Sequence, residues 1–249
     1  MTGLDALVIS GAGVVAGGVN AAVGSGSLLT FPTLLAVGYP PVLANVSNTL
    51  GLVPGSVSGA IGYRRELAGQ RRRILQMLPA SIIGGVAGAM LLLAEPGAFR
   101  DVVPTLILVA VAMVLLQPRI AKRRRARGVV AEHPGPLLQV GVLVCAVYGG
   151  YFGAAMSVII LGLLGILIDD DLQRLNGVKN VITAAVNGVA AVYFAFATHV
   201  AWLAVVLLWV SSAVGGQIGA HVGRRLPAPV LRGAVAIVGT AVAIDLLVT

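Results

Sequence analysis

The residue best placed to do chemistry is Lys179, a cation inside an apolar stretch of the sequence. A charge in hydrocarbon is costly unless a partner compensates it, so such a lysine marks a binding site or a misplaced segment boundary. Lys179 belongs to a polar stripe with the spacing i, i+3, i+4, i+7 and i+11, which a helix presents along one face. The stripe consists of Asn176, Lys179, Asn180, Thr183 and Asn187. We expect it to bind a small anion.

A structural role for these side chains is the alternative interpretation. Asparagine and serine side chains join membrane helices through hydrogen bonds worth about 0.6 kcal/mol each. A lysine near a helix end can also extend its ammonium to the interface. Either way, a polar stripe in a membrane helix faces protein or water and not lipid. On the anion hypothesis, polar residues of the first half complete the site. They are Asn20, Asn45, Ser47 and Asn48.

Two short stretches of small residues form a second kind of candidate site. The first is Gly24, Ser25, Gly26 and Ser27, and the second is GAAMS, from Gly153 to Ser157. Each precedes a short apolar segment, and a helix that begins there directs its N–H groups and the positive end of its dipole outward. Glycine also lets a backbone approach a ligand closely. We expect anion binding at both stretches; ordinary tight turns between tilted helices are the alternative.

The composition indicates what kind of protein positions these residues. Of 249 residues, 58% are hydrophobic and 10% are charged, with a mean hydropathy of +0.98. These values predict an all-α polytopic membrane protein. A formal charge of +8 would suggest nucleic acid in a soluble protein. Here the basic residues flank apolar segments, where they set orientation and contact the lipid bilayer, so nucleic-acid binding is not expected.

Ten apolar segments are predicted, in two sets of five. Their approximate bounds are 5–22, 27–38, 42–61, 74–94, 101–117, 137–152, 155–168, 176–197, 201–221 and 233–248. The sequence therefore predicts a first repeat over 1–117, a basic cytoplasmic linker over 118–136 and a second repeat over 137–249. The segments 27–38 and 155–168 would span only about 18 and 21 Å as helices. We expect half-helices whose hairpins meet near the membrane midplane.

The distribution of charge predicts the orientation. If the loop 62–73 is cytoplasmic, 15 of the 17 Lys and Arg residues lie on the cytoplasmic side. Both termini are then external, and the two halves have opposite topology. This arrangement is an inverted repeat, which is common in secondary transporters.

Several other functions are not expected. The single cysteine, Cys145, rules out an intramolecular disulfide, and no spacing of ligands predicts a metal or another cofactor. All nine acidic residues lie in loops or near segment ends, and 169–171 should form a solvated turn. A carboxylate relay is therefore not expected, and neither is an enzyme. The glycine stripes at 51–59 and 215–223 predict close helix packing within the monomer, with a homodimer as a further possibility.

The run GVVAGGVNAAVGSGSLLTFPTLLAVGYPPVLANVSNTLGLVPG and its echo YGGYFGAAMSVIILGLLG, followed by LNGVKNV, resemble the TauE/SafE group of exporters. The resemblance implies a bacterial inner-membrane transporter for a small sulfur-containing anion such as sulfite, sulfoacetate or a related sulfonate. It favours export by alternating access over an anion channel-like pore or a membrane-embedded subunit of a larger complex. The second half has GAAMS where a run of glycines is usual in the family, which argues against equal roles for the two half-helices.

Overall fold

The computed structural model describes residues 2–22, 24–125, 135–168 and 170–222, with Ile237, Thr240 and Ile244 beyond them. The described chain is helical, as predicted. Its helices are α1 (Gly3–Ala22), α2 (Ser27–Ala36), α3 (Pro41–Gly62), α4 (Arg71–Ala94), α5 (Pro96–Arg125), α6 (Pro136–Tyr151), α7 (Met156–Leu167), α8 (Leu172–Ala197) and α9 (Trp202–Val222). They correspond in order to the first nine predicted segments. The tenth, 233–248, lies outside the described residues except for three isolated positions.

The fifth helix continues beyond the boundary that hydropathy predicts. We expected its segment to end at residue 117, but α5 runs on to Arg125. Lysine and arginine have high helix propensity, so a basic run extends a helix although it adds no apolar surface. The rest of the predicted linker, 126–134, lies outside the described residues.

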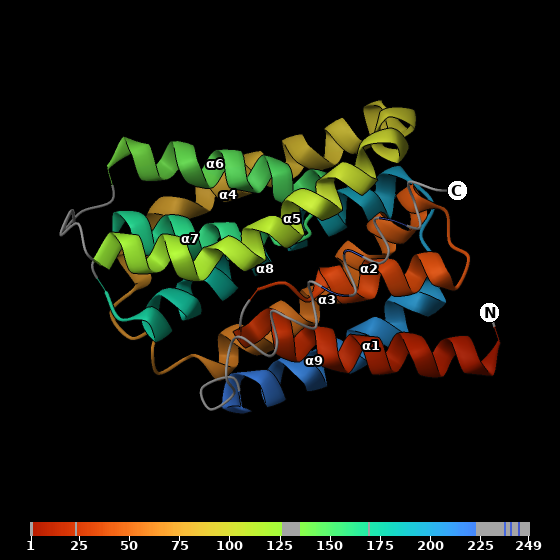
Figure 1. Ribbon diagram of the computed structural model, residues 1–249, viewed down its shortest axis with the longest axis horizontal. Helices are drawn as coiled ribbons and strands as arrows, with labels where there is room; N and C mark the ends of the chain where they lie inside the picture. Colours follow the sequence, from red (N-terminus) through yellow and green to blue (C-terminus); the bar gives the residue numbers. More distant parts are fainter. Residues whose placement is uncertain are drawn as a thin grey trace.

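Two of the most extensive helix contacts in the bundle are those of α1 with α9 and of α4 with α6 (Figure 1). Small residues make both contacts possible. A Cβ added at Gly215 would lie 2.0 Å from the carbonyl oxygen of Val14, and one added at Gly88 would lie 2.0 Å from that of Val147. The central helices α3 and α8 contact each other, and they also pack on α9 and α4 respectively.

The predicted glycine stripes lie in contacts within one chain. Gly51 packs against Leu208 of α9, and Gly219 packs against the backbone of Gly18 in α1. Close packing within the monomer is therefore confirmed at these positions. Gly223 lies outside the described residues.

The described helices differ widely in length. Four are long and apolar enough to cross a membrane: Gly3–Ala22, Arg71–Ala94, Leu172–Ala197 and Trp202–His221. By contrast, α2 and α7 extend only about 15 and 18 Å, roughly half of a hydrocarbon core of about 30 Å.

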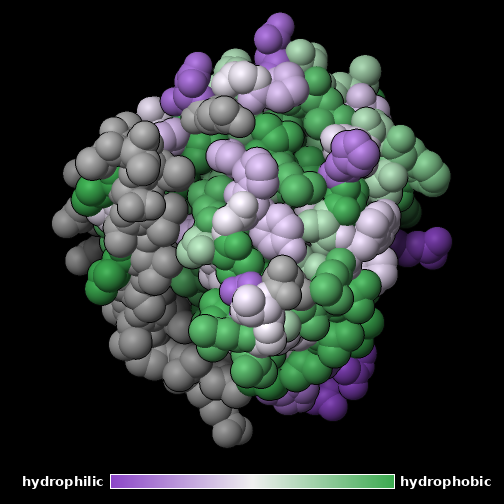
Figure 2. Space-filling view, turned by 90° about the vertical axis from the view of Figure 1, so that its right-hand side faces the viewer, coloured by the Kyte–Doolittle hydropathy of each residue, from purple (hydrophilic) through white to green (hydrophobic). Residues whose placement is uncertain are grey.

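Large apolar side chains cover much of the outside of the bundle. Leu7, Phe196 and Val210 are 73%, 89% and 65% exposed. The end of the bundle at which α1 begins also shows extensive hydrophobic surface, with hydrophilic residues in scattered patches (Figure 2). An apolar exterior of this extent is expected of a protein that lipid surrounds.

Candidate functional site

Two helix breaks meet inside the bundle. The first break (residues 24–26) separates α1 from α2, and the second (residues 152–155) separates α6 from α7. A Cβ added at Gly24 would lie 2.6 Å from the Cβ of Ser157. The Ser27 hydroxyl donates a hydrogen bond of 3.4 Å to the carbonyl oxygen of Gly153. The N-terminal ends of α2 and α7 therefore lie side by side, although 126 residues separate Ser27 from Gly153 in the sequence.

Both breaks depend on backbone conformations that favour glycine. Gly24 and Gly153 have φ angles of +98° and +77°, which residues with a Cβ rarely adopt. At position 26 glycine is needed for a different reason, which is lack of space: a Cβ there would lie 2.2 Å from the carbonyl oxygen of Ala16. The two short stretches of small residues thus lie between helices, and the helices that follow them, α2 and α7, have only 10 and 12 residues.

The N-terminal ends of α2 and α7 lack side-chain caps. Their N-cap residues, Gly26 and Ala155, provide no capping hydrogen bond. Beside the first of them, the hydroxyl of Ser25 is fully buried and has no partner among the described residues. In these first turns the N–H groups of Leu28, Met156 and Val158 already donate to backbone carbonyl oxygens. The positive dipole end and the unpaired Ser25 hydroxyl are the features that suit such a helix start to an anion.

Lys179 satisfies the opposite end of the first break, the C-terminus of α1. Its side chain is 0% exposed, and its ammonium donates to the carbonyl oxygens of Asn20 at 2.9 Å and Ala21 at 3.4 Å. The last carbonyls of a helix have no partner in the helix and carry the negative end of its dipole. Lys179 therefore caps α1, and the alternative in which it extends to the interface is wrong.

Two asparagines of the same α8 stripe strengthen this cap. The amide nitrogen of Asn176 donates to the carbonyl oxygens of Ala21 at 3.2 Å and Ala22 at 3.3 Å, and that of Asn180 donates to Ala21 at 3.2 Å. The amide oxygens of Asn176 and Asn180 are buried without a partner among the described residues. The stripe faces protein along its length, as predicted, since all five of its residues are buried.

The second break is held by neutral groups. Asn45 of α3 donates 2.9 Å from its amide nitrogen to the carbonyl oxygen of Tyr151, at the end of α6. The Tyr148 hydroxyl donates 2.8 Å to the carbonyl oxygen of Ala154. Phe152 packs edge-on against Phe31 of α2, with ring centroids 5.4 Å apart. This break is therefore anchored by aromatic packing and carries no charged contact among the described residues.

The remaining predicted site residues divide into two groups. Ser157 adjoins the breaks and shares a hydrogen bond of 2.9 Å with Thr183 of the stripe. Asn48 accepts a hydrogen bond from the hydroxyl of Thr30 in α2. Ser47 lies elsewhere, because its hydroxyl accepts from the backbone N–H of Ala201, just before α9.

Two further asparagines contribute unequally. Asn20 supplies its carbonyl to Lys179, while its amide nitrogen donates 3.2 Å to the hydroxyl of Ser56. Asn187 lies about 12 Å beyond Lys179 along α8, too far to contact the same group. Sequence reasoning missed the contribution of Tyr148; its position in YGGY, directly before the break, is the one signal that pointed there.

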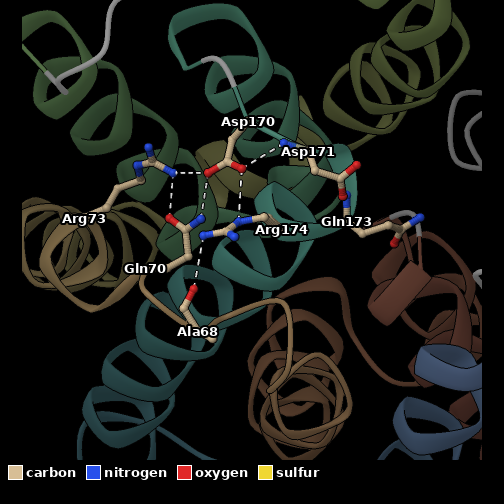
Figure 3. Close-up of polar contacts among 7 residues, drawn as sticks. All are labelled: Ala68, Gln70, Arg73, Asp170, Asp171, Gln173 and Arg174. Carbon is tan, nitrogen blue, oxygen red and sulfur yellow. Dashed lines mark hydrogen bonds and ion pairs between the residues drawn. The ribbon is translucent and has the colours of Figure 1, made fainter.

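A polar cluster connects the two halves near the start of α8 (Figure 3). Asp170 forms an ion pair of 2.7 Å with Arg73 of α4 and one of 3.1 Å with Arg174 of α8. Gln70 donates 2.7 Å to the same carboxylate, and Arg174 also donates 3.1 Å to the carbonyl oxygen of Ala68. We call Gln70, Arg73, Asp170 and Arg174 the inter-half cluster.

The prediction of a solvated turn over 169–171 is wrong for Asp170, whose side chain is only 18% exposed. Burial alone would raise the pKa of this carboxyl, but the hydrogen bonds from Arg73 and Gln70 outweigh that effect, so the pKa lies below its usual value. Asp171 has a separate role, since its carboxylate caps α8 by accepting 2.8 Å from the backbone N–H of Gln173. Asp169 lies outside the described residues.

The sequence matches a known family over nearly its whole length. The family model described as "Sulfite exporter TauE/SafE" matches residues 9–246. No solved structure matches the chain.

Curated relatives carry similar descriptions. A "Probable membrane transporter protein" of Haemophilus influenzae is 26% identical over 242 residues, covering 92% of this chain and 91% of that protein. The "Probable membrane transporter protein YfcA" of Escherichia coli K12 is 25% identical over 224 residues, covering 88% of this chain and 82% of that protein. A third relative, the "Probable membrane transporter protein ORF9" of Sinorhizobium sp, is 26% identical over 242 residues, covering 95% of this chain and 90% of that protein.

Proposed function

The chain belongs to the TauE/SafE family of membrane transporters, and we propose that it is a secondary transporter that exports a small sulfur-containing anion. Sulfite, sulfoacetate and related sulfonates form the substrate class. The bacterial inner membrane is its proposed location, with both termini external. The observation that carries the proposal is the meeting of two uncapped helix N-termini inside the bundle, beside a buried lysine.

The electrostatics of the first break favour an anion. A helix break brings together the negative end of one helix and the positive end of the next, so the two dipoles oppose each other at one place. Lys179 binds the carbonyls at the end of α1 and so offsets the negative end. The start of α2 then acts without that opposition, and the buried hydroxyl of Ser25 can donate to a ligand. An oxyanion in contact with these groups would find donors in place of its hydration shell.

The packing supports two inverted repeats. When α1 to α5 are matched in order with the helices from α6 onward, the α1–α9 pair corresponds to the α6–α4 pair, and α1–α2 corresponds to α6–α7. Such an exchange of partners is what two related halves of opposite topology produce.

The burial of the site supports alternating access. Ser25, Lys179 and Asn180 are each 0 or 1% exposed, so a ligand must wait for the helices around the breaks to separate. The inter-half cluster joins the start of α4 to the start of α8, and on the proposed orientation it lies on the cytoplasmic side. Opening toward the cytoplasm would therefore break its ion pairs.

The proposed direction needs no coupling acid. An inside-negative potential favours exit of an anion by about 2.3 kcal/mol per charge per 100 mV. Among the described residues, the acids lie at helix ends or in connections and none pairs with Lys179.

Flux into proteoliposomes tests the proposal. The panel comprises sulfite, sulfate, thiosulfate, sulfoacetate, taurine and a carboxylate control, each as cargo and as competitor. We expect saturable flux of one or more sulfur oxyanions, competed by the others. Non-saturating flux would indicate a pore instead, and no flux from the purified protein would indicate a subunit of a larger complex.

A pair of variants locates the site. Lys179→Met should remain folded and lose most of its flux, because the end of α1 is no longer offset. The control is Ser81→Ala, since that hydroxyl bonds only to Met77 of its own helix α4 and should leave flux unchanged. Wild-type flux in folded Lys179→Met would move the site away from the first break.

A further inference from the structure

The end of α1 presents two carbonyl oxygens to one positive charge. The Lys179 ammonium contacts the carbonyl oxygens of Asn20 and Ala21. The amide nitrogens of Asn176 and Asn180 both donate to the Ala21 carbonyl, so their two amide oxygens lie close to it. Those amide oxygens are buried and have no donor among the described residues. They remain acceptors without a partner beside the lysine.

Neutral oxygens in this arrangement are suited to a monovalent cation. Hard cations prefer oxygen ligands, and transporters with broken helices hold sodium on the carbonyls at half-helix C-termini. Among the described residues, no carboxylate pairs with Lys179, so its positive charge is met by the carbonyl oxygens at the end of α1. The chemistry of the site is that of a cation site, and a side chain of the protein fills it.

We infer that the Lys179 ammonium is a tethered cation in a monovalent-cation site formed by the carbonyl oxygens at the α1 C-terminus. An ion from solution is excluded because the ammonium already occupies its place. If the proposed function holds, anion transport consequently proceeds without a sodium ion at this position.

Two substitutions separate the oxygens from the charge. Lys179→Ala removes the side chain and leaves room beside the Ala21 carbonyl, whereas Lys179→Met removes only the charge and fills most of the space. A small cation should therefore enter the alanine variant and not the methionine variant. Sodium chloride and methylammonium chloride are the probes, and choline chloride at equal ionic strength is the size control.

The readout is thermal unfolding of the purified protein, with chloride as the only anion added. We expect sodium or methylammonium to raise the Tm of Lys179→Ala by about 3–5 °C over choline, at a concentration roughly tenfold above its Kd. Lys179→Met and the wild type should show no difference among the three salts. Lys179→Ser provides a second small variant, and recovery of folded protein in each salt is scored for a variant that unfolds on extraction.

Two results would overturn the inference: neither small cation stabilises or recovers Lys179→Ala or Lys179→Ser, or sodium stabilises the wild type as strongly as the alanine variant. Failure of the proposed function looks different. In that case cation rescue of Lys179→Ala is observed, while the wild type carries no saturable flux of any anion in the panel.

Discussion

The two helix breaks share a backbone plan and differ in their side chains. Each has a glycine with positive φ, a short following helix without a side-chain cap, and an asparagine from α3 or α8 bound to the end of the preceding helix. At the first break a lysine and two asparagines converge on α1. At the second, two neutral side chains, Asn45 and Tyr148, donate to backbone carbonyls, and Phe152 is buried among aromatic rings. Related geometry thus serves two tasks: the first break is built for charge, and the second for anchoring.

The largest loss of stability should come from adding a side chain at Gly26, in the first break. Gly26→Ala places a Cβ only 2.2 Å from the Ala16 carbonyl oxygen. Because both sides of this contact are backbone, we expect destabilisation at the upper end of overpacking effects, about 3 kcal/mol. Gly11→Ala, on α1 with nothing within 4 Å, should be neutral or slightly stabilising. Thermal unfolding of the two variants measures the difference, and equal Tm values would show that α1 and α2 are not in contact there.

The capping asparagines test whether the breaks differ in redundancy. Asn45→Ala removes the amide donor to the Tyr151 carbonyl, and an unsatisfied buried acceptor costs about 1–3 kcal/mol. Asn180→Ala should cost less than about 1 kcal/mol, since Asn176 and Lys179 still donate to Ala21. For flux we expect the reverse order, with Asn180→Ala the more impaired. The comparison of the breaks fails if Asn45→Ala is the milder variant in unfolding and the worse one in flux.

Both helix breaks could be predicted from the sequence, but the partner of Lys179 could not. Small residues beside short apolar runs located both breaks, and helical spacing put Lys179 on a buried stripe with Asn176 and Asn180. What the ammonium faces could not be read, because the carbonyl of Asn20 lies 159 residues away and every residue carries a carbonyl. The pattern favoured a free ligand as partner; the structure provides a helix end.

The inter-half cluster shows a second limit of the same kind. Asp170 is one of three consecutive aspartates, a pattern typical of a solvated turn. One of its two ion pairs is with Arg73 of the other half, which is 97 residues away. Basic residues predict the orientation in the membrane because that prediction sums over many residues. The prediction of one ion pair needs the distance between two side chains, which the sequence does not contain.

A test outside both breaks is Asp170→Asn. It removes the charge from two ion pairs and should destabilise the protein by about 1–2 kcal/mol, because the hydrogen bonds to Arg73 and Arg174 are charge-assisted and partly buried. If the cluster holds the cytoplasmic side closed, a cysteine at position 25 should label faster from that side in the Asn variant. Unchanged labelling would limit the cluster to a structural role. Asp171→Asn, which keeps an N-cap acceptor for Gln173, is the matched control.

The pH dependence of that difference follows from the pKa of Asp170. The folded-state pKa is lowered, so the contribution is fully present above the unfolded-state pKa of about 3.9. It is lost as pH falls through the folded-state value. The Tm difference between wild type and Asp170→Asn should therefore be constant from about pH 5 to 8 and shrink below about pH 4. A difference that shrinks near pH 6 or 7 would assign the effect to another group.

The smallest effect is expected at Ala155, which has a φ of 59° at the second break. Glycine relieves a conformation that costs other residues roughly 1–2 kcal/mol, but it loses more backbone entropy and a buried methyl group. We expect Ala155→Gly to change stability by less than about 1 kcal/mol and to leave flux intact. Loss of flux in a stable Ala155→Gly would show that the second break also contacts the cargo.

The pairing of α1 with α9 has a consequence for how the protein is made. About 180 residues separate the end of α1 from the start of α9, and Lys179, which caps α1, is synthesised late as well. At translation rates of about 5–20 residues per second, α1 waits roughly 10–40 s for the partners of its glycine face and its carbonyl end. During that interval α2 and α3 are the helices of the first half on which α1 packs in the folded protein. The chain is thus made through a stage in which the first helix lacks its main partner, and that partner is the ninth helix.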